Sequence, residues 1–120
     1  MTDETVAVII PAYNAGNYLR RAVESVFATG YPLTEVVIVD DGSTDDTGEI
    51  AQALRMQSGG ECRLVRHSDQ GNHGVSASRN LGINVTNSQW VAFLDADDYF
   101  LPNRFDSLRQ VNSEHESSPD

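Results

Sequence analysis

The chain has 120 residues and a formal net charge of −10, because 18 acidic residues face 8 arginines and no lysine. This length suits one domain with a real core, and so few basic residues argue against a nucleic-acid-binding surface. No apolar run approaches the roughly 20 residues that a membrane-spanning helix needs. The single cysteine, Cys62, excludes an internal disulfide and a cysteine-built zinc site, fits a reducing cytoplasm, and is expected to be a plain core residue.

The first quarter of the chain predicts a strand followed by a helix. Val6 to Ile10 is a continuous apolar run of strand length, and Pro11 ends it. Apolar residues then recur at helical spacing from Leu19 to Phe27, and Gly30 to Pro32 stops this helix.

The same order of elements repeats in the middle of the chain. Val36 to Val39 predicts a second buried strand, and residues 40 to 47 form an acidic turn in which Ser43, Thr44 or Asp45 can cap the next helix. That helix carries apolar residues from Ile50 to Leu54 and ends at Gly59-Gly60. Arg63 to Arg66 predicts a shorter and less buried strand.

A third helix and a fourth strand follow a polar loop over residues 68 to 74. The helix spans about Val75 to Val85, and an apolar run over residues 91 to 94 predicts a buried strand. Pro102 suits the first turn of a further helix with Phe105, Leu108 and Val111 on its inner face, and residues 112–120 are expected to be a polar, frayed tail.

Strands that alternate with helices predict an α/β fold, in which a Rossmann-like, mostly parallel sheet is flanked by helices. Ligands of such sheets bind beyond the carboxyl ends of the strands. Asp40, Asp41, Asp95 and Asp97 all follow predicted strands. We therefore expect these acids to converge on one rim of a single domain that covers residues 1–120.

The acids after the fourth predicted strand suggest a metal site. Asp95, Asp97 and Asp98 stand within four positions, and carboxylates so placed can share a hard cation such as Mg²⁺ or Mn²⁺. The alternative is a solvated turn. An EF-hand starting at Asp95 fails, because its glycine position would be Phe100 and its twelfth position Asp106.

The other polar segments carry weaker signals. Residues 40 to 45 could be only a turn and a helix cap, although Asp40 and Asp41 are surplus to a cap and could accept hydrogen bonds from a nucleotide base or ribose. The loop from Gly71 to Gly74 lacks the pattern of a P-loop but could offer backbone amides to phosphate. The three histidines are not at metal-ligand spacing.

In four runs the chain resembles the N-terminal, nucleotide-binding half of a family 2 glycosyltransferase with the glycosyltransferase-A fold. Together these runs span nearly all of residues 6 to 105. They are Val8 to Asn14, Glu35 to Asp45, Gly74 to Ile83, and Phe93 to Asp98 with Pro102 beyond it.

The resemblance implies a nucleotide-diphosphate sugar donor, most often a uridine one. Pro11 and Tyr13 would border the base, Asp41 would accept a hydrogen bond from the base edge, and Asp40 would support that loop. Asp95 would lie by the ribose and the sugar phosphate.

The resemblance also assigns a metal. Asp97, in the DXD motif, would ligate Mn²⁺ or Mg²⁺ that bridges the diphosphate, with Asp95 and Asp98 as further candidates. Arg79 and Asn80 match the family motif, and a buried helix contact and a phosphate contact remain open for them.

The activity so implied is inverting transfer of a hexose to an acceptor hydroxyl, as in cell-envelope polysaccharide biosynthesis. The acceptor could be a saccharide, a lipid or a protein. The catalytic base is expected outside this chain, so we expect a fragment that is inactive by itself. The alternative is a non-catalytic module that only binds nucleotide sugar. We expect the protein in the cytoplasm, free or at the inner face of the membrane.

Overall fold

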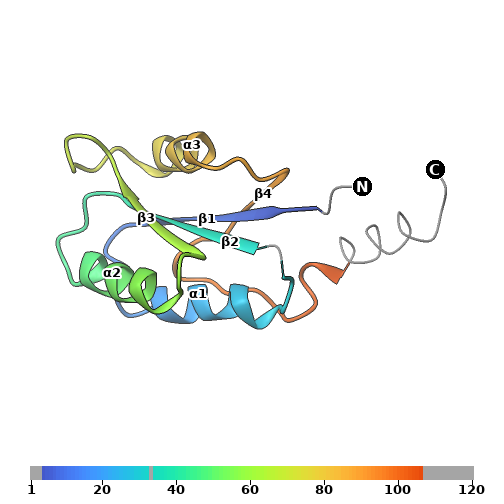
Figure 1. Ribbon diagram of the computed structural model, residues 1–120. Helices are drawn as coiled ribbons and strands as arrows, with labels where there is room; N and C mark the ends of the chain where they lie inside the picture. Colours follow the sequence, from blue (N-terminus) through green and yellow to red (C-terminus); the bar gives the residue numbers. More distant parts are fainter. Residues whose placement is uncertain (1–3, 33, 107–120) are drawn as a thin grey trace.

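A computed structural model describes residues 4–32 and 34–106 of the chain (Figure 1). Strands and helices alternate in it as the sequence predicts. The elements are β1 (Val6–Ala12), α1 (Leu19–Ala28), β2 (Thr34–Asp40), α2 (Thr47–Gln57), β3 (Cys62–Arg66), α3 (Val75–Val85) and β4 (Trp90–Phe93).

The strands among the described residues form one parallel sheet in the order β3-β2-β1-β4. Helices α1 and α2 cover one face of this sheet, and α3 covers the other (Figure 1). The central strands β1 and β2 are the continuous apolar runs of the sequence, and Ile9, Ile10 and Val37 in them are fully buried. The expected α/β fold with a parallel sheet flanked by helices is confirmed.

Successive side chains of the central strands enter two different cores, because a strand alternates its faces. Val8, Ile10 and Val36 pack with α1 and α2 in the larger core, whereas Ile9 and Val37 pack on the α3 side. The helix α3 lies close to the sheet at Gly82, where an added Cβ would come within 2.5 Å of the Ile9 Cγ2 atom.

The prediction of a buried fourth strand is wrong. Strand β4 lies at the sheet edge, and Trp90, Val91 and Phe93 are 51%, 37% and 42% exposed. Its apolar residues indicated burial, but burial also requires neighbours on both sides. Among the described strands, β4 pairs only with β1. The less buried third strand was predicted correctly, and within it Cys62 is a buried core residue.

The segment after β4 runs along α1. Residues 102–105 form turns where the first turn of a helix was predicted, and the predicted inner residue Phe105 is buried, with its ring centroid 5.8 Å from that of Tyr31. Leu108, Val111 and the predicted tail over residues 112–120 lie outside the described residues. No helix among the described residues is both long and apolar enough to cross a membrane.

The strand register aligns the carboxyl ends of three strands. Ala12 of β1 pairs with Asp40 of β2, which pairs with Arg66 of β3. Strand β4 ends earlier, with Phe93 beside Ile9. The residues that follow β4 therefore lie beside the last residues of β1, at the rim where the acids were expected.

Candidate nucleotide-binding site

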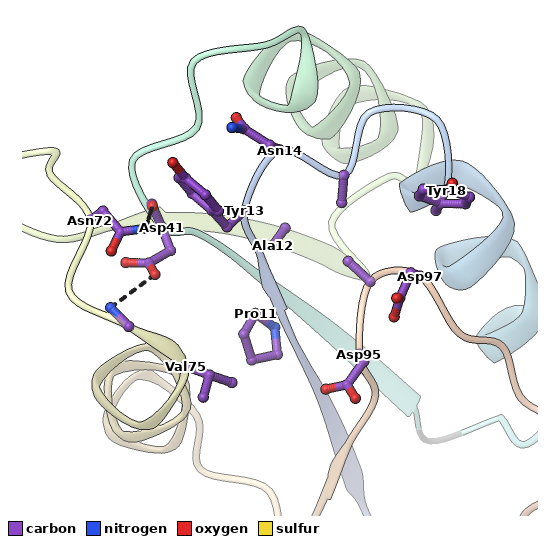
Figure 2. A pocket seen from close by; sticks show the side chains of 13 residues that line it. Pro11, Ala12, Tyr13, Asn14, Tyr18, Asp41, Asn72, Val75, Asp95 and Asp97 are labelled. Carbon is purple, nitrogen blue, oxygen red and sulfur yellow. Dashed lines mark hydrogen bonds between the residues drawn. The ribbon is translucent and has the colours of Figure 1, made fainter.

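A pocket of about 410 Å³ opens at the carboxyl ends of the strands (Figure 2). This volume is in the range of small-molecule sites. Five residues singled out from the sequence line it, and they come from three separate segments: Pro11, Tyr13, Asp41, Asp95 and Asp97.

The two groups of acids lie at opposite ends of this pocket. Figure 2 shows Asp41 beside Asn72 at one end and Asp95 with Asp97 at the other, with Pro11 and other residues of the β1 exit between them. The pocket thus offers two separate negatively charged ends joined by a less polar middle.

Asp41 is buried, and backbone amides of the loop before α3 hold its carboxylate. The His73 amide donates to Oδ1 at 2.7 Å and the Gly74 amide donates to Oδ2 at 3.0 Å. The Asn72 side chain donates to the Asp41 carbonyl at 3.1 Å. Our expectation that this loop offers its amides to phosphate is corrected for these two, because a buried carboxylate of the same protein already uses them.

The neighbouring acid Asp40 lies on the other side of the β2 exit and holds the turn. Its Oδ1 accepts from the Ser43 amide at 3.1 Å, and its Oδ2 lies 3.4 Å from Arg66 Nε. This placement is compatible with a loop-supporting role, which stays a prediction. At Gly42 the turn has φ of +72° and passes so close to the loop before α3 that a Cβ would lie 2.5 Å from the Asn72 nitrogen.

The acids after β4 are exposed and are held by a turn and two arginines. The Asp98 amide donates to the Asp95 carbonyl at 2.9 Å, and the Asp98 carboxylate accepts from the next amide. Arg21 Nη2 donates to the Asp97 carbonyl at 3.2 Å. The Asp97 carboxylate itself is directed toward the pocket (Figure 2).

Arg79 of α3 is the arginine that forms an ion pair with a carboxylate at this end of the pocket. Its Nη2 lies 3.6 Å from Asp95 Oδ1, and its guanidinium lies over the Phe93 ring, 5.1 Å from the centroid. The Arg79 Nε is buried, and it has no hydrogen-bond partner among the residues that the structure describes. A buried donor that lacks a partner is uncommon, so a bound anion could satisfy it.

The rim of the pocket at Tyr13 and Asn14 is fastened to the start of α2. The Asn14 amide donates to Ser43 Oγ at 3.0 Å and the Thr44 amide donates to Asn14 Oδ1 at 2.8 Å. The N-cap residue of α2 is Asp46, which makes no side-chain capping hydrogen bond, so none of the three predicted residues is the N-cap. Asp45, one residue earlier, accepts from the Thr47 amide through its Oδ1 at 2.9 Å. The hydrogen bonds from the Thr47 side chain and backbone lower the pKa of Asp45.

The acids at the Asp95 and Asp97 end of the pocket suit a divalent cation that is shared with a ligand. Among the residues that the structure describes, no three His, Cys, Asp or Glu side chains are grouped to hold a metal unaided. Mg²⁺ and similar cations, however, are often held by one or two carboxylates together with substrate phosphates and water. Asp97 and Asp95, exposed in one pocket, fit that kind of shared site.

Sequence reasoning missed several residues of the pocket. Asn72, Asn14 and Tyr18 line it alongside the predicted residues. Asn72 lies in the loop from Gly71 to Gly74, for which the sequence indicated backbone amides as ligands but no role for the Asn72 side chain. Tyr18 lies just before α1 and reads as an ordinary helix-start residue, so the sequence held no signal for it.

Comparisons with known proteins point to one family. The family model described as Glycosyl transferase family 2 matches residues 7–117. The glycosyltransferase GlyG of Streptococcus pneumoniae is 34% identical over 115 residues, which cover 96% of this chain and 37% of GlyG. The uncharacterized glycosyltransferase YibD of Escherichia coli is 40% identical over 103 residues, which cover 86% of this chain and 29% of YibD.

Solved structures agree with this assignment. S. aureus TarS (residues 1–349) in complex with UDP-GlcNAc matches 93% of the chain with a TM-score of 0.80 and 28% identity, over 32% of that protein. The mannosyltransferase PcManGT of Pyrobaculum calidifontis, solved with GDP-Man and Mn²⁺, has a TM-score of 0.78 at 24% identity, a likeness of fold. This chain spans about a third of the length of these proteins, and it belongs to glycosyl transferase family 2.

Proposed function

We propose that the pocket binds a nucleotide-diphosphate sugar, with the base at the Asp41 end and the diphosphate at the Asp95 and Asp97 end. The carrying observation is that acids from two distant segments lie at opposite ends of one pocket with Pro11 and Tyr13 along it. A donor that is a base at one end and a diphosphate at the other matches this layout. TarS, a structural relative, was solved with UDP-GlcNAc, which favours a uridine donor.

We propose that Asp97, with Asp95 and Asp98 as further candidates, holds Mn²⁺ or Mg²⁺ together with the diphosphate. When bound, such a cation supplies charge neutralisation to a diphosphate leaving group. This chain has no lysine to supply that charge. Arg79, 3.6 Å from Asp95 and with its buried Nε lacking a partner in the described chain, is placed to add one further positive group.

The reaction that we propose is inverting transfer of a hexose to an acceptor hydroxyl. The bond from the anomeric carbon to the phosphate oxygen breaks, and a bond from that carbon to the acceptor oxygen forms. The acceptor proton passes to a general base. We propose that this base and the acceptor site belong to further sequence, that residues 1–120 are the donor-binding part of the domain, and that they transfer little sugar alone.

The cellular location is also a proposal. We place the protein in the cytoplasm, free or at the inner face of the membrane, because its single cysteine suits a reducing compartment.

A module that binds nucleotide sugar without transfer is the second candidate function. Transfer assays separate the two: a longer form of the protein that still binds donor but transfers nothing would favour the module.

Calorimetric titration with UDP, with and without Mn²⁺, tests the proposal. We expect heat of binding that depends on Mn²⁺, and a loss of affinity of about tenfold or more, or ~1.4 kcal/mol, in Asp97→Asn. Glu24→Gln, which removes one negative charge from the exposed side of α1, is the matched control and should bind as the parent does. A UDP affinity that changes neither on addition of Mn²⁺ nor in Asp97→Asn would overturn the donor-site assignment.

A further inference from the structure

The Asp41 carboxylate, which we expect to contact the base, is almost completely enclosed by protein groups. Its side chain is 6% exposed. An ionised carboxylate offers about four lone-pair sites, and the His73 and Gly74 amides occupy one site on each oxygen. A third polar group beside this carboxylate then limits which oxygen is left for a ligand.

That third group is His67, the residue directly after β3. Its Nε2 lies 3.2 Å from Asp41 Oδ1 and 3.1 Å from the hydroxyl oxygen of Ser78. The His67 side chain is 11% exposed, and Ser78 on α3 is fully buried. The Nε2 contact with Ser78 is a hydrogen bond, whereas the contact with Asp41 is a close charge contact that stabilises the carboxylate when Nε2 carries a proton.

The neighbouring histidine holds this ring in place. The His73 ring lies against the His67 ring, with centroids 4.3 Å apart and planes tilted by 39°. His73 Nε2 is in turn 2.7 Å from Asp69 Oδ1, a hydrogen bond that lowers the pKa of Asp69. The loop before α3 and the helix α3 itself thus both contact the His67 ring, which lies at the end of β3 beside Asp41.

We propose that His67 is a positioning residue that makes the Asp41 end of the pocket selective for uracil over cytosine. With the His73 amide and the His67 ring both beside Oδ1, the oxygen left for a ligand is Oδ2. An acceptor fixed there suits the ring N–H of uracil, whereas the corresponding ring nitrogen of cytosine carries no hydrogen and is itself an acceptor. The inference rests on the proposed function, because it assumes that a nucleotide occupies this pocket.

The placement of Asp41 supports this role. The residue lines the pocket next to Tyr13 and Asn72 (Figure 2), although most of its surface is covered. Without His67, Oδ1 would lose one of its two close polar neighbours, and the space left beside it would let the carboxylate rotate or admit water. The recognition of uracil would then weaken, and the contacts to ribose and diphosphate elsewhere in the pocket would not.

The test compares UDP with CDP by calorimetry in the presence of Mn²⁺, for the parent protein and for His67→Leu and His67→Gln. We expect the parent to bind UDP about tenfold or more tighter than CDP. His67→Leu should lose most of that preference through weaker UDP binding, with CDP binding unchanged. His67→Gln, whose amide N–H can donate to Asp41, should keep most of it.

The outcomes separate the two proposals. If the parent binds no UDP, the proposed function fails and this inference fails with it. If the parent prefers UDP but His67→Leu weakens UDP and CDP equally, or neither, only the role of His67 is overturned. Should His67→Leu not fold, ¹⁵N NMR of the histidine rings in the parent at pH 8 decides: a proton on His67 Nε2 supports the inference, and a neutral ring protonated only on Nδ1 overturns it.

Discussion

The hydroxyl of Thr47 anchors the loop after β1, which lines the pocket, so its removal should perturb that loop without touching a pocket-lining side chain. This side chain is fully buried at the start of α2. Its Oγ1 accepts from the Ala15 amide at 2.9 Å and donates to the Asp45 carboxylate. One hydroxyl therefore joins the loop after β1, which carries Tyr13, to Asp45 just before α2.

Thr47→Val removes this hydroxyl and keeps the shape of the side chain. The Ala15 amide, in a residue that is 7% exposed, then lacks its acceptor, and a buried donor left unsatisfied costs about 1–3 kcal/mol. We expect the free energy of unfolding to fall by about that amount. UDP affinity should fall as well, because the loop that carries Tyr13 loses an anchor.

Urea denaturation and hydrogen exchange of the Ala15 amide are the assays. Thr47→Ser, which keeps the hydroxyl and loses only a methyl group, is the matched control: it should lose about 1 kcal/mol for that group while the Ala15 amide stays protected. A Thr47→Val protein with parental stability and a protected Ala15 amide would refute the reasoning.

Three further predictions follow from other contacts. Gly82→Ala should lower the urea midpoint, because its Cβ would lie 2.5 Å from Ile9 Cγ2 and overpacking costs about 1–3 kcal/mol. This cost opposes a helix-propensity gain of about 1 kcal/mol, and a higher midpoint would contradict the close packing of α3 on β1. The hydrogen bonds from Thr47 that lower the pKa of Asp45 stabilise the fold at neutral pH and are lost as pH falls below about 4. Asp45→Asn should therefore reduce the loss of stability between pH 5 and pH 3, and an unchanged loss would count against a stabilising role of these hydrogen bonds. Burial raises the pKa of Cys62 to about 11, so its thiol should react with a thiol reagent at pH 8 only in denaturant, and rapid reaction of the folded protein would be the opposite result.

The sequence was sufficient to predict the central part of the fold. Val6 to Ile10 and Val36 to Val39 are continuous apolar, β-branched runs, and such runs are typical of strands buried on both faces. The turn residues and glycines between them marked where each helix begins and ends. The carboxyl ends of parallel strands meet at one rim, so the sequence was sufficient to predict that the distant acids Asp41 and Asp95 lie on the same rim.

The remaining features depend on neighbours that no local pattern records. Residues 91 to 93 are as apolar as a buried strand, but their exposure depends on the edge position of β4. His67 looked like an ordinary residue after a strand, and its contact with Asp41 joins positions 26 residues apart. The separation of the two acidic ends of the pocket is likewise a property of the folded sheet.

We propose above all that a divalent cation and a nucleotide diphosphate meet at the Asp95 and Asp97 end of the pocket. Substoichiometric Mn²⁺ added with UDP should broaden the amide NMR signals of residues 95–98 first, and Asp97→Asn should abolish that effect. Broadening centred instead on the acids around Asp45 and Glu49, or no broadening with UDP present, would contradict the account.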